Sequence, residues 1–338
     1  MTRSITRTIY GSTLQTARHL GSVYQIPPYS TLNEWVAALG TNVVSQTNFY
    51  SLNGSSNVQP MLLSNPSIAV FNAASYANNL TDTQGMIAQY LAIGNLGHLN
   101  FAGADPTQPS WTGPKPHAAR SSGLFGQIPF VLRAYNPSNP NWDIPATGAA
   151  VSKVNYRHRT WLMIGGKLYV AYFLRLLTPS GNPPPAVSME YNQVTNGVTT
   201  TTSFNPTAND LFTPLVPGTP GAPILTTGNS LSAASAIQIL LGQDEVNELI
   251  NVSTILYNNP NQAIVSEIGI CQGLDKMATY SPDGVTSSTT ANAPQMAEAC
   301  GVQVSTFISA YYPLPYTSSQ LTINMDLGAE EPLYGISA

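Results

Sequence analysis

Charged side chains are scarce in this sequence. Asp, Glu, Lys and Arg together make up 8% of its 338 residues, whereas an average soluble domain has about 25%. Because a free monomer normally depends on surface charge for its solubility, this composition favours a protein whose surface is largely covered by neighbouring subunits. The alternative is a secreted β protein whose uncharged polar surface is simply hydrated.

Cysteines and long apolar segments are also few. Cys271 and Cys300 are the only cysteines, too few for a disulfide scaffold, so two buried thiols are favoured over one disulfide. No apolar segment reaches the roughly 18 residues that a membrane span needs. Residues 1–7 are not followed by the apolar core of a signal peptide. We therefore expect a soluble chain that is made in a cytoplasm and has no membrane partner.

Recognisable catalytic and cofactor motifs are absent from the sequence. It contains no G-x-S-x-G elbow, no phosphate-binding P-loop and no G-x-G-x-x-G turn. His19, His98, His117 and His158 are far apart, and no pair of them has the spacing of metal ligands. His158 has arginines on both sides, which indicates a neutral, surface or stacking role. The sequence thus predicts no enzymatic activity, no cofactor and no metal site.

The few charges are unevenly placed along the chain. Residues 1–176 hold 11 of the 12 Lys and Arg and 4 of the 16 Asp and Glu, a balance of +7. Residues 177–338 hold the remaining 1 basic and 12 acidic residues, a balance of −11. Copies of such a chain could attract one another head to tail, or the two halves could pair inside one molecule. The basic residues are too dispersed for phosphate tracking, which argues against nucleic-acid binding.

Two β-hairpins are the clearest local signals. Residues 156–177 form two β-prone runs around Gly165-Gly166, and residues 187–204 form two more around Asn196-Gly197. Paired glycines and Asn-Gly both accept the positive φ angles of a two-residue hairpin turn. The segment Thr199–Thr202 is β-branched and uncharged, as expected of an exposed strand edge. We expect four antiparallel strands here.

The C-terminal part adds one helix and further strands. Residues 244–257 have helical periodicity, and Asp244 and Glu245 fit the first turn, where the helix dipole favours acids. Strands are predicted at 263–270, 302–312 and 321–327. The predicted fold class is therefore mainly β with a few short helices, built from antiparallel sheets with hairpins and an extended N-terminal arm.

Proline-rich segments suggest the domain organisation. We expect an extended arm over 1–30, which ends at Pro27-Pro28, and a β-rich part over 31–145. The latter contains a long loop at 103–123 and a short edge strand at 128–132. A β domain over 146–338 would hold both hairpins (156–204) and the helix (244–257). The arm and the loop are predicted to reach neighbouring subunits.

Tyrosine is abundant, with 17 residues. Tyrosine is enriched in protein interfaces because its ring packs while its hydroxyl stays hydrogen-bonded, although a core or sugar-facing role is the alternative. With the arginines, the tyrosines near the N-terminus supply the candidate assembly contacts. These are Arg3, Arg7, Tyr10, Tyr24, Tyr29, Arg157, Arg159 and Arg175.

Several segments resemble virion structural proteins of large tailed bacteriophages. They are Thr8–Gln15, Pro28–Glu34, Ala92–His98, Gln127–Arg133, Tyr169–Arg175, Ser266–Cys271 and Val304–Ser309. The resemblance implies a component of the phage particle, in its tail, baseplate or neck, with its own copies and other virion proteins as partners. It implies no enzymatic residues. Two alternatives are a secreted carbohydrate-binding or carbohydrate-active β protein and an icosahedral capsid subunit.

Overall fold

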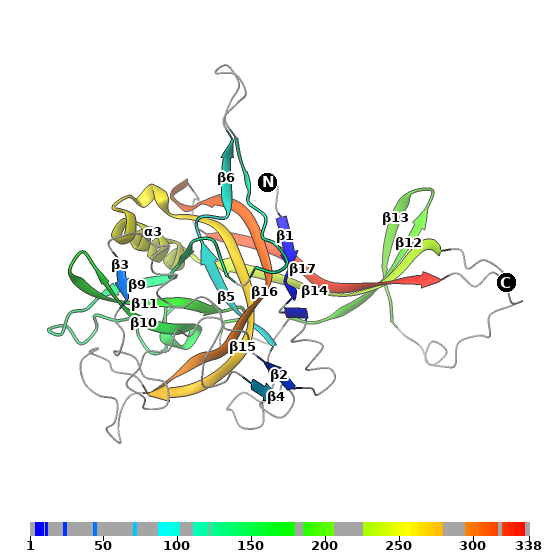
Figure 1. Ribbon diagram of the computed structural model, residues 1–338. Helices are drawn as coiled ribbons and strands as arrows, with labels where there is room; N and C mark the ends of the chain where they lie inside the picture. Colours follow the sequence, from blue (N-terminus) through cyan, green and yellow to red (C-terminus); the bar gives the residue numbers. More distant parts are fainter. Residues whose placement is uncertain are drawn as a thin grey trace, which may run out of the picture. The chain divides into compact units, whose positions relative to one another are not determined.

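The chain is mainly antiparallel β-sheet with a few short helical segments, as the sequence predicts (Figure 1). This computed structural model describes residues 4–9, 11–12, 23–25, 43–45, 70–72, 87–101, 111–121, 123–179, 185–205, 226–279, 295–316 and 320–334. The chain divides into two compact units. Unit 1 comprises Met1–Gly181 and Leu241–Leu321, and unit 2 comprises Asn182–Leu240 and Thr322–Ala338.

Unit 1 is organised around a sheet of nine described strands. Seven follow one another in the order β1-β16-β15-β5-β11-β10-β3, while β8 pairs with β5 and β9 pairs with β11. The strands are β1 (Ser4–Arg7), β3 (Val43–Ser45), β5 (Ile87–Gly94), β8 (Gln127–Ile128), β9 (Val131–Ala134), β10 (Tyr156–Ile164), β11 (Lys167–Leu176), β15 (Ile264–Thr279) and β16 (Gln295–Pro313).

The first predicted hairpin is confirmed as β10 and β11. Ile164 pairs with Lys167, and Gly165 and Gly166 adopt φ angles of 55° and 77°. Both values lie in the left-handed region that glycine reaches without a Cβ clash. Trp161 and Phe173 of this hairpin are completely buried, so the hairpin forms the centre of the core.

The predicted strand at 128–132 is interrupted at Pro129. β8 precedes the proline and pairs with β5, whereas β9 follows it and pairs with β11. Proline has no N–H to donate to a ladder, so it suits the point where the chain changes partners. Phe130 N donates to Tyr172 O at 2.8 Å immediately afterwards.

The predicted strands at 263–270 and 302–312 are parts of a much longer pair, β15 and β16. The pairing runs from Ile264↔Pro313 to Thr279↔Gln295, with register shifts that bend the strands. Cys271 lies within β15 as a buried free thiol, and burial raises its pKa.

Two small sheets and three short 3₁₀ segments complete the described part of unit 1. β2 (Val23–Gln25) pairs with β4 (Val70–Asn72), and β6 (His98–Phe101) pairs with β7 (Trp111–Pro114). The region 103–123 was predicted to be a loop, but it contains β7, because Trp111–Pro114 finds a partner strand that local sequence does not reveal. The 3₁₀ segments are η3 (Lys153–Asn155), η5 (Pro260–Gln262) and η6 (Leu314–Tyr316).

The predicted helix is confirmed as α3 (Gln243–Tyr257), which lies beside β9 in unit 1 (Figure 1). Val246, Leu249 and Val252 are buried on its inner face, and each contributes roughly 1.5–3 kcal/mol through burial. Asn258 ends the helix in a left-handed conformation with φ of 53°. Within the described ranges, no helix is both long and apolar enough to cross a membrane.

Unit 2 contains a four-stranded sheet in the order β13-β12-β14-β17. Its strands are β12 (Ser188–Thr195), β13 (Val198–Ser203), β14 (Thr226–Leu241) and β17 (Leu321–Tyr334). The second predicted hairpin is confirmed as β12 and β13, with φ angles of 53° at Asn196 and 76° at Gly197. The predicted strand at 321–327 begins β17.

The units differ from the domains expected from the sequence. The expected boundary between 145 and 146 falls inside unit 1, where β5 and β9 before it share a sheet with β10 and β11 after it. The sheet continues across the expected boundary because strands from both sides of it pair with one another. The proline-rich segment between them does not interrupt the sheet.

The start of the expected N-terminal arm is extended, but it belongs to the sheet of unit 1. Ser4–Arg7 pairs with β16, and Thr8 N donates to Ser305 O at 2.9 Å. Most of the remaining residues of 1–30 lie outside the described ranges.

Candidate functional site

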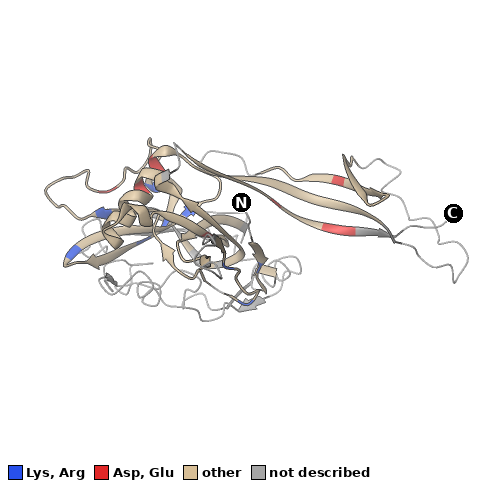
Figure 2. Ribbon diagram, turned by 90° about the horizontal axis from the view of Figure 1, so that it is seen from above, with Lys and Arg blue, Asp and Glu red and all other residues tan. Residues whose placement is uncertain are grey.

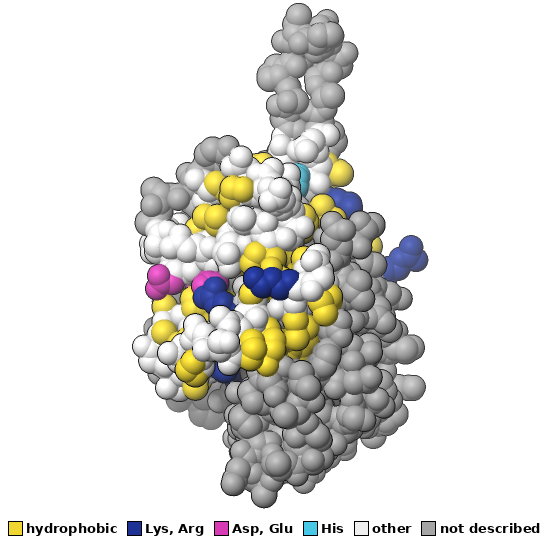
Figure 3. Space-filling model, turned by 90° about the vertical axis from the view of Figure 1, so that its left-hand side faces the viewer, with side chains coloured by type: hydrophobic (Ala, Val, Ile, Leu, Met, Phe, Trp, Pro, Cys, Tyr) yellow, Lys and Arg dark blue, Asp and Glu magenta, His cyan; other side chains and the backbone are white. Residues whose placement is uncertain are grey.

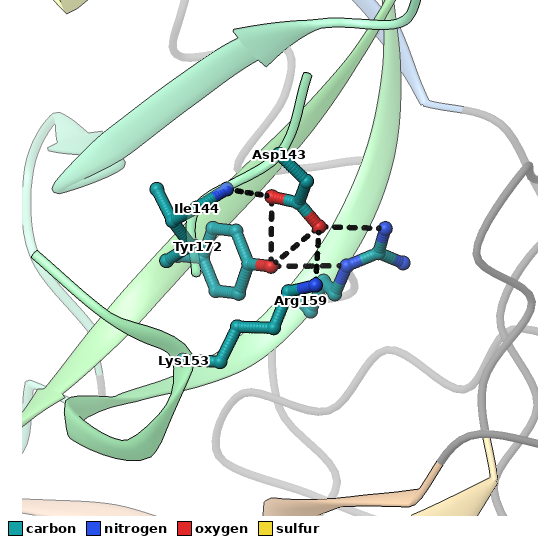
Figure 4. Close-up of polar contacts among 5 residues, drawn as sticks. All are labelled: Asp143, Ile144, Lys153, Arg159 and Tyr172. Atoms are coloured by element: carbon teal, nitrogen blue, oxygen red, sulfur yellow. Dashed lines mark hydrogen bonds and ion pairs between the residues drawn. The ribbon is translucent and has the colours of Figure 1, made fainter. Parts of the chain in front are cut away.

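The first cluster of charged side chains surrounds Asp143 (Figure 4). Its carboxylate accepts from the Tyr172 hydroxyl at 3.0 Å and lies 3.3 Å from Arg159 and 3.1 Å from Lys153. Arg159 Nε in turn donates to Tyr172 Oη at 3.1 Å. The side chains of Arg159 and Asp143 are 0% and 8% exposed, so this is a buried network that ties the 136–152 segment to the β10–β11 hairpin.

A second buried cluster joins α3 to the same hairpin. Glu245 Oε1 lies 2.6 Å from Arg175 Nε and accepts from the Tyr156 hydroxyl at 2.7 Å. Gly242 N also donates to Glu245 Oε2 at 3.2 Å, which satisfies the N-cap N–H at the start of the helix as the glutamate of a capping box does. Burial, with the nearby Glu245 carboxylate, raises the pKa of Tyr156.

A third cluster is the pair formed by His117 and Glu267. Their Nε2 and Oε2 atoms are 3.1 Å apart, and both side chains are 0% exposed. The carboxylate also accepts from Phe125 N at 2.8 Å and Gly126 N at 2.7 Å. A Cβ at Gly94 would lie 2.4 Å from Glu267 Oε1, so only glycine permits this close approach.

The electrostatics of this third cluster favour uncharged forms. Burial, with a smaller effect of Lys115, lowers the pKa of His117 to about 4, while burial raises the pKa of Glu267. The rings of Phe125 and Phe307 lie 4.2 and 3.9 Å from the imidazole. A histidine beside a carboxylate resembles a catalytic base, but aromatic rings enclose this one and no atom of the pair reaches solvent.

Burial of the arginines corrects one prediction of the sequence. Arg157, Arg159 and Arg175 lie at the end of the hairpin opposite its turn, but they are 5%, 1% and 6% exposed. Arg159 and Arg175 pair with the internal acids Asp143 and Glu245, and Arg157 donates to the Val154 and Tyr156 carbonyls. They are therefore core residues and cannot be surface assembly contacts.

The other predicted contacts have different positions. Arg7 is exposed on β1. Tyr24 lies in β2, where only the backbone is described, and Arg3, Tyr10 and Tyr29 lie outside the described ranges.

His158 and His98 are also structural in character, and His19 lies outside the described ranges. His158 is 1% exposed, and burial lowers its pKa to about 3, so it is neutral as predicted but is not on the surface. His98 packs edge-on against Tyr311, with ring centroids 5.0 Å apart. Within the described part of the chain, no three His, Cys, Asp or Glu residues lie close enough together to hold a metal ion.

The exposed surface of unit 2 offers a different kind of site. Residues directly opposite each other in an antiparallel sheet share a face, so the register divides the side chains into two sets. One face carries Met189, Tyr191, Val198 and Leu231. Met189 and Val198 are 43% and 66% exposed, and Val187, two residues before Met189, is 71% exposed. This apolar face is the group Val187, Met189, Tyr191, Val198 and Leu231.

The opposite face of the same sheet is polar and internally hydrogen-bonded. The Asn192 amide donates to Ser230 Oγ at 3.4 Å and to Ser232 Oγ at 3.3 Å, and Thr201 Oγ1 donates to Asn192 Oδ1 at 2.7 Å. Ser230 Oγ donates to Glu330. The first face therefore differs from the second in its exposed apolar side chains, although it also carries polar residues such as Gln193, Thr200 and Thr202.

Strand β13 is an exposed edge of this sheet. Phe204 N donates to Met189 O at 2.8 Å, so Met189 and Phe204 face each other as a hydrogen-bonded pair. Along an antiparallel ladder every second pair is hydrogen-bonded in this way. By alternation, Thr199, Thr201 and Ser203 direct their backbone N–H and C=O groups away from β12. Every residue of β13 is exposed, and its sequence VTTTTS contains no charge or proline. It lacks the features that usually prevent strand addition at an edge.

The charge asymmetry between the two halves of the sequence becomes smaller when the charges are counted by unit. Unit 1 contains all 12 basic residues and 11 of the acids, a balance of +1, whereas unit 2 contains the other five acids, a balance of −5. Among the described residues, the strands of unit 2 carry acidic and no basic side chains (Figure 2). In unit 1, bases from the first half meet acids from the second half, as in Arg175–Glu245 and Arg133–Glu248. The alternative of internal pairing therefore accounts for much of the apparent polarity.

Comparison with known proteins places most of the chain in one family. Residues 70–338 match the model of a protein family that is described as a family of unknown function (DUF7208). No curated protein matches the chain, and no solved structure does.

Proposed function

The chain belongs to the DUF7208 family, whose function is unknown. For this member we propose the role of a structural subunit of a tailed-phage virion. It acts in the tail, baseplate or neck, where it binds copies of itself and other virion proteins. Its function is assembly, and the three buried clusters serve to hold unit 1 rigid. The reason for proposing a virion is the resemblance of the segments named in the sequence analysis to virion structural proteins.

The observation that carries the proposal is the exposed edge of β13 beside the apolar face of unit 2. An uncharged edge strand is a template for another strand, and exposed apolar side chains favour coverage by a partner. In a free monomer the exposed edge and the exposed apolar side chains would both face water. In an assembled subunit a partner strand would pair with the edge and cover the apolar side chains.

The partner strand that fits best is β1 of a neighbouring copy. In the described part of the chain β1 pairs on one side only, with β16, so its other side is an edge. Ile5 on this edge is 58% exposed and Arg7 is exposed beside it. Unit 2 has only acidic charges, so a cationic β1 is the complementary edge.

Pairing of β13 with β1 joins two different surfaces, so it is a heterologous contact. Such contacts close into rings or continue as filaments, which are the architectures of baseplates, necks and tails. The two alternatives predict other products: a closed shell for a capsid subunit and a monomer for a secreted carbohydrate-binding protein.

The test is the assembly state of variants at either edge. Thr201→Pro removes an outward N–H without removing a ladder bond to β12, and Thr201→Val is the matched control. We expect rings or filaments from the wild type and from Thr201→Val in negative-stain electron microscopy. Light scattering should give monomers for Thr201→Pro and for Arg7→Glu, with unchanged circular dichroism.

Two results would contradict the proposal. One is a wild-type chain that stays monomeric at high micromolar concentration, and the other is assembly of Thr201→Pro and Arg7→Glu as efficient as that of the wild type. A closed shell would instead favour the capsid alternative.

A further inference from the structure

Unit 1 contains a surface pocket of about 540 Å³ that none of the three buried clusters uses. β9 and the segment after it form one wall, the start of β11 forms another, and α3 contributes Asn251 and Ile255. Tyr135 N donates to Leu168 O at 2.9 Å, which holds these walls together. The pocket lies entirely within described residues.

An aromatic platform lines this pocket. Trp142 and Tyr135 stand at 89° to each other with ring centroids 5.2 Å apart. Behind them Trp161 is completely buried and lies 5.5 Å from Trp142 and 5.7 Å from Tyr135. A rigid ring backed by a second ring presents a π-face to the polarised C–H groups of a saturated ring, such as a pyranose.

Two of the three asparagine side chains of the pocket present hydrogen-bond donors, whereas Asn251 donates to Leu132 O at 3.5 Å and leaves its oxygen as an acceptor. Asn136 Oδ1 accepts from Ser138 N at 3.1 Å, and Asn139 Oδ1 accepts from Asn141 N at 2.9 Å. These bonds occupy the side-chain oxygens within the loop, so each amide offers its NH₂ group to a ligand. A ligand of this pocket must therefore be rich in acceptors.

The charge of the lining is positive. Lys167 and Arg133 are its charged residues, and no acid is among the lining residues. Arg133 is already paired with Glu248. Lys167 is exposed, 5.7 Å over the ring of Tyr169, and has no ion pair among the described residues. On the side of unit 1 that carries β9–β11, Lys and Arg side chains lie among hydrophobic and uncharged ones, with a few acidic side chains beside them (Figure 3).

We infer that this pocket binds an acidic saccharide, a pyranose that bears a carboxylate. The sugar ring stacks on Trp142, the amides of Asn136 and Asn139 donate to hydroxyl or carboxylate oxygens, and Lys167 pairs with the carboxylate. A neutral sugar would leave Lys167 without a counter-charge, and a small anion would leave the aromatic platform bare. The inference does not depend on the assembly role proposed above.

The experiment compares three probes on the full chain by isothermal titration calorimetry and tryptophan fluorescence. The probes are an oligogalacturonate, a neutral galactose oligosaccharide of the same length, and acetate. We expect saturable binding of the oligogalacturonate, with at least tenfold weaker binding of the neutral oligosaccharide and of acetate.

Three variants make the test specific. Asn139→Asp keeps an oxygen for Asn141 N but replaces the donor with an anion, so binding should weaken by more than roughly tenfold. Lys167→Gln should lose most of the preference for the acidic sugar. Arg120→Gln removes an exposed positive charge outside the pocket and should leave the affinity within twofold of the wild type.

The inference is overturned by any of four results. They are absence of saturable binding at about ten millimolar ligand, equal affinity for acidic and neutral sugars, competition by acetate at the same concentration as the oligogalacturonate, and equal losses in Arg120→Gln and Lys167→Gln. Circular dichroism of each variant shows whether a loss comes from unfolding.

Discussion

Arg175 and Glu245 lie face to face inside unit 1, with 2.6 Å between Arg175 Nε and Glu245 Oε1. The pair connects the end of β11 with the first turn of α3, and the Tyr156 hydroxyl donates to the same carboxylate. Three residues further along the helix, Glu248 pairs with Arg133, whose side chain is 31% exposed. The helix thus carries one enclosed ion pair and one partly solvated pair of the same chemistry.

Glu245→Gln should destabilise the protein much more than Glu248→Gln. Removing one charge of a buried pair leaves Arg175 without compensation, at a cost of about 3–5 kcal/mol, whereas a solvated pair contributes roughly 0–1 kcal/mol. Urea unfolding followed by far-ultraviolet circular dichroism measures both changes. If both variants lost the same free energy of unfolding, water would have to reach Arg175, and the pair would not be enclosed.

Asp143→Asn should loosen the segment between β9 and β10. The substitution leaves Arg159, which is 0% exposed, beside a neutral amide, so we expect a loss of about 3 kcal/mol or more. Limited proteolysis should show faster cleavage within 136–152. Lys153→Gln is the control, because the Lys153 side chain is 18% exposed and its pair is weaker. If both variants resist protease like the wild type, Asp143 does not anchor this segment.

His158 should make the protein less stable in mild acid. Burial lowers its pKa to about 3 in the folded chain, whereas the unfolded chain binds a proton near pH 6.5. Between these values the unfolded state holds more protons, so stability is fully present above pH 6.5 and is lost as the pH falls. The loss is about 1.4 kcal/mol per pH unit.

The variant His158→Asn isolates this contribution. Asparagine tolerates the φ of 56° at this position and does not titrate. The pH dependence of the free energy of unfolding between pH 4 and 6 should therefore become shallower by about 1.4 kcal/mol per unit. His98→Asn should change the slope less, because His98 is only partly buried. Glu267 acts in the opposite direction, since its raised pKa makes stability fall as the pH rises above 4.5. An unchanged slope in His158→Asn would refute the assignment.

Local signals in the sequence were sufficient for the hairpins and the helix. Gly165-Gly166 and Asn196-Gly197 specify their turns through φ angles that few other residues adopt, and α3 is specified by its periodicity and its acidic first turn. These elements could be predicted because the residues that determine them are neighbours in the chain.

The buried clusters could not be predicted in this way. The sequence places Glu245 in the first turn of a helix, and Asp143 lies just before the predicted boundary between 145 and 146. Their partners Arg175 and Arg159 are 70 and 16 residues away, and only the folded sheet brings the charges together. The one available signal was the scarcity of charge itself, because a buried arginine needs strong acceptors and an acid is the strongest of them.

The His117–Glu267 pair was missed for a related reason. His117 falls in the segment predicted to be a loop, and Glu267 lies in a predicted strand whose other residues are mostly apolar. The pair depends on the close approach at Gly94 and on backbone donors from Phe125 and Gly126. No spacing along the chain encodes that arrangement.

The order of strands in unit 2 has a consequence for the newly made protein. β14 lies between β12 and β17 in the sheet, but β17 follows about 80 residues later in the chain, which at roughly 5–20 residues per second corresponds to about 4–16 s of translation. During that interval the nascent chain displays an uncovered edge at β14 in addition to the one at β13. Synthesis on crowded polysomes would therefore expose this sheet to premature pairing between neighbouring nascent chains until β17 arrives.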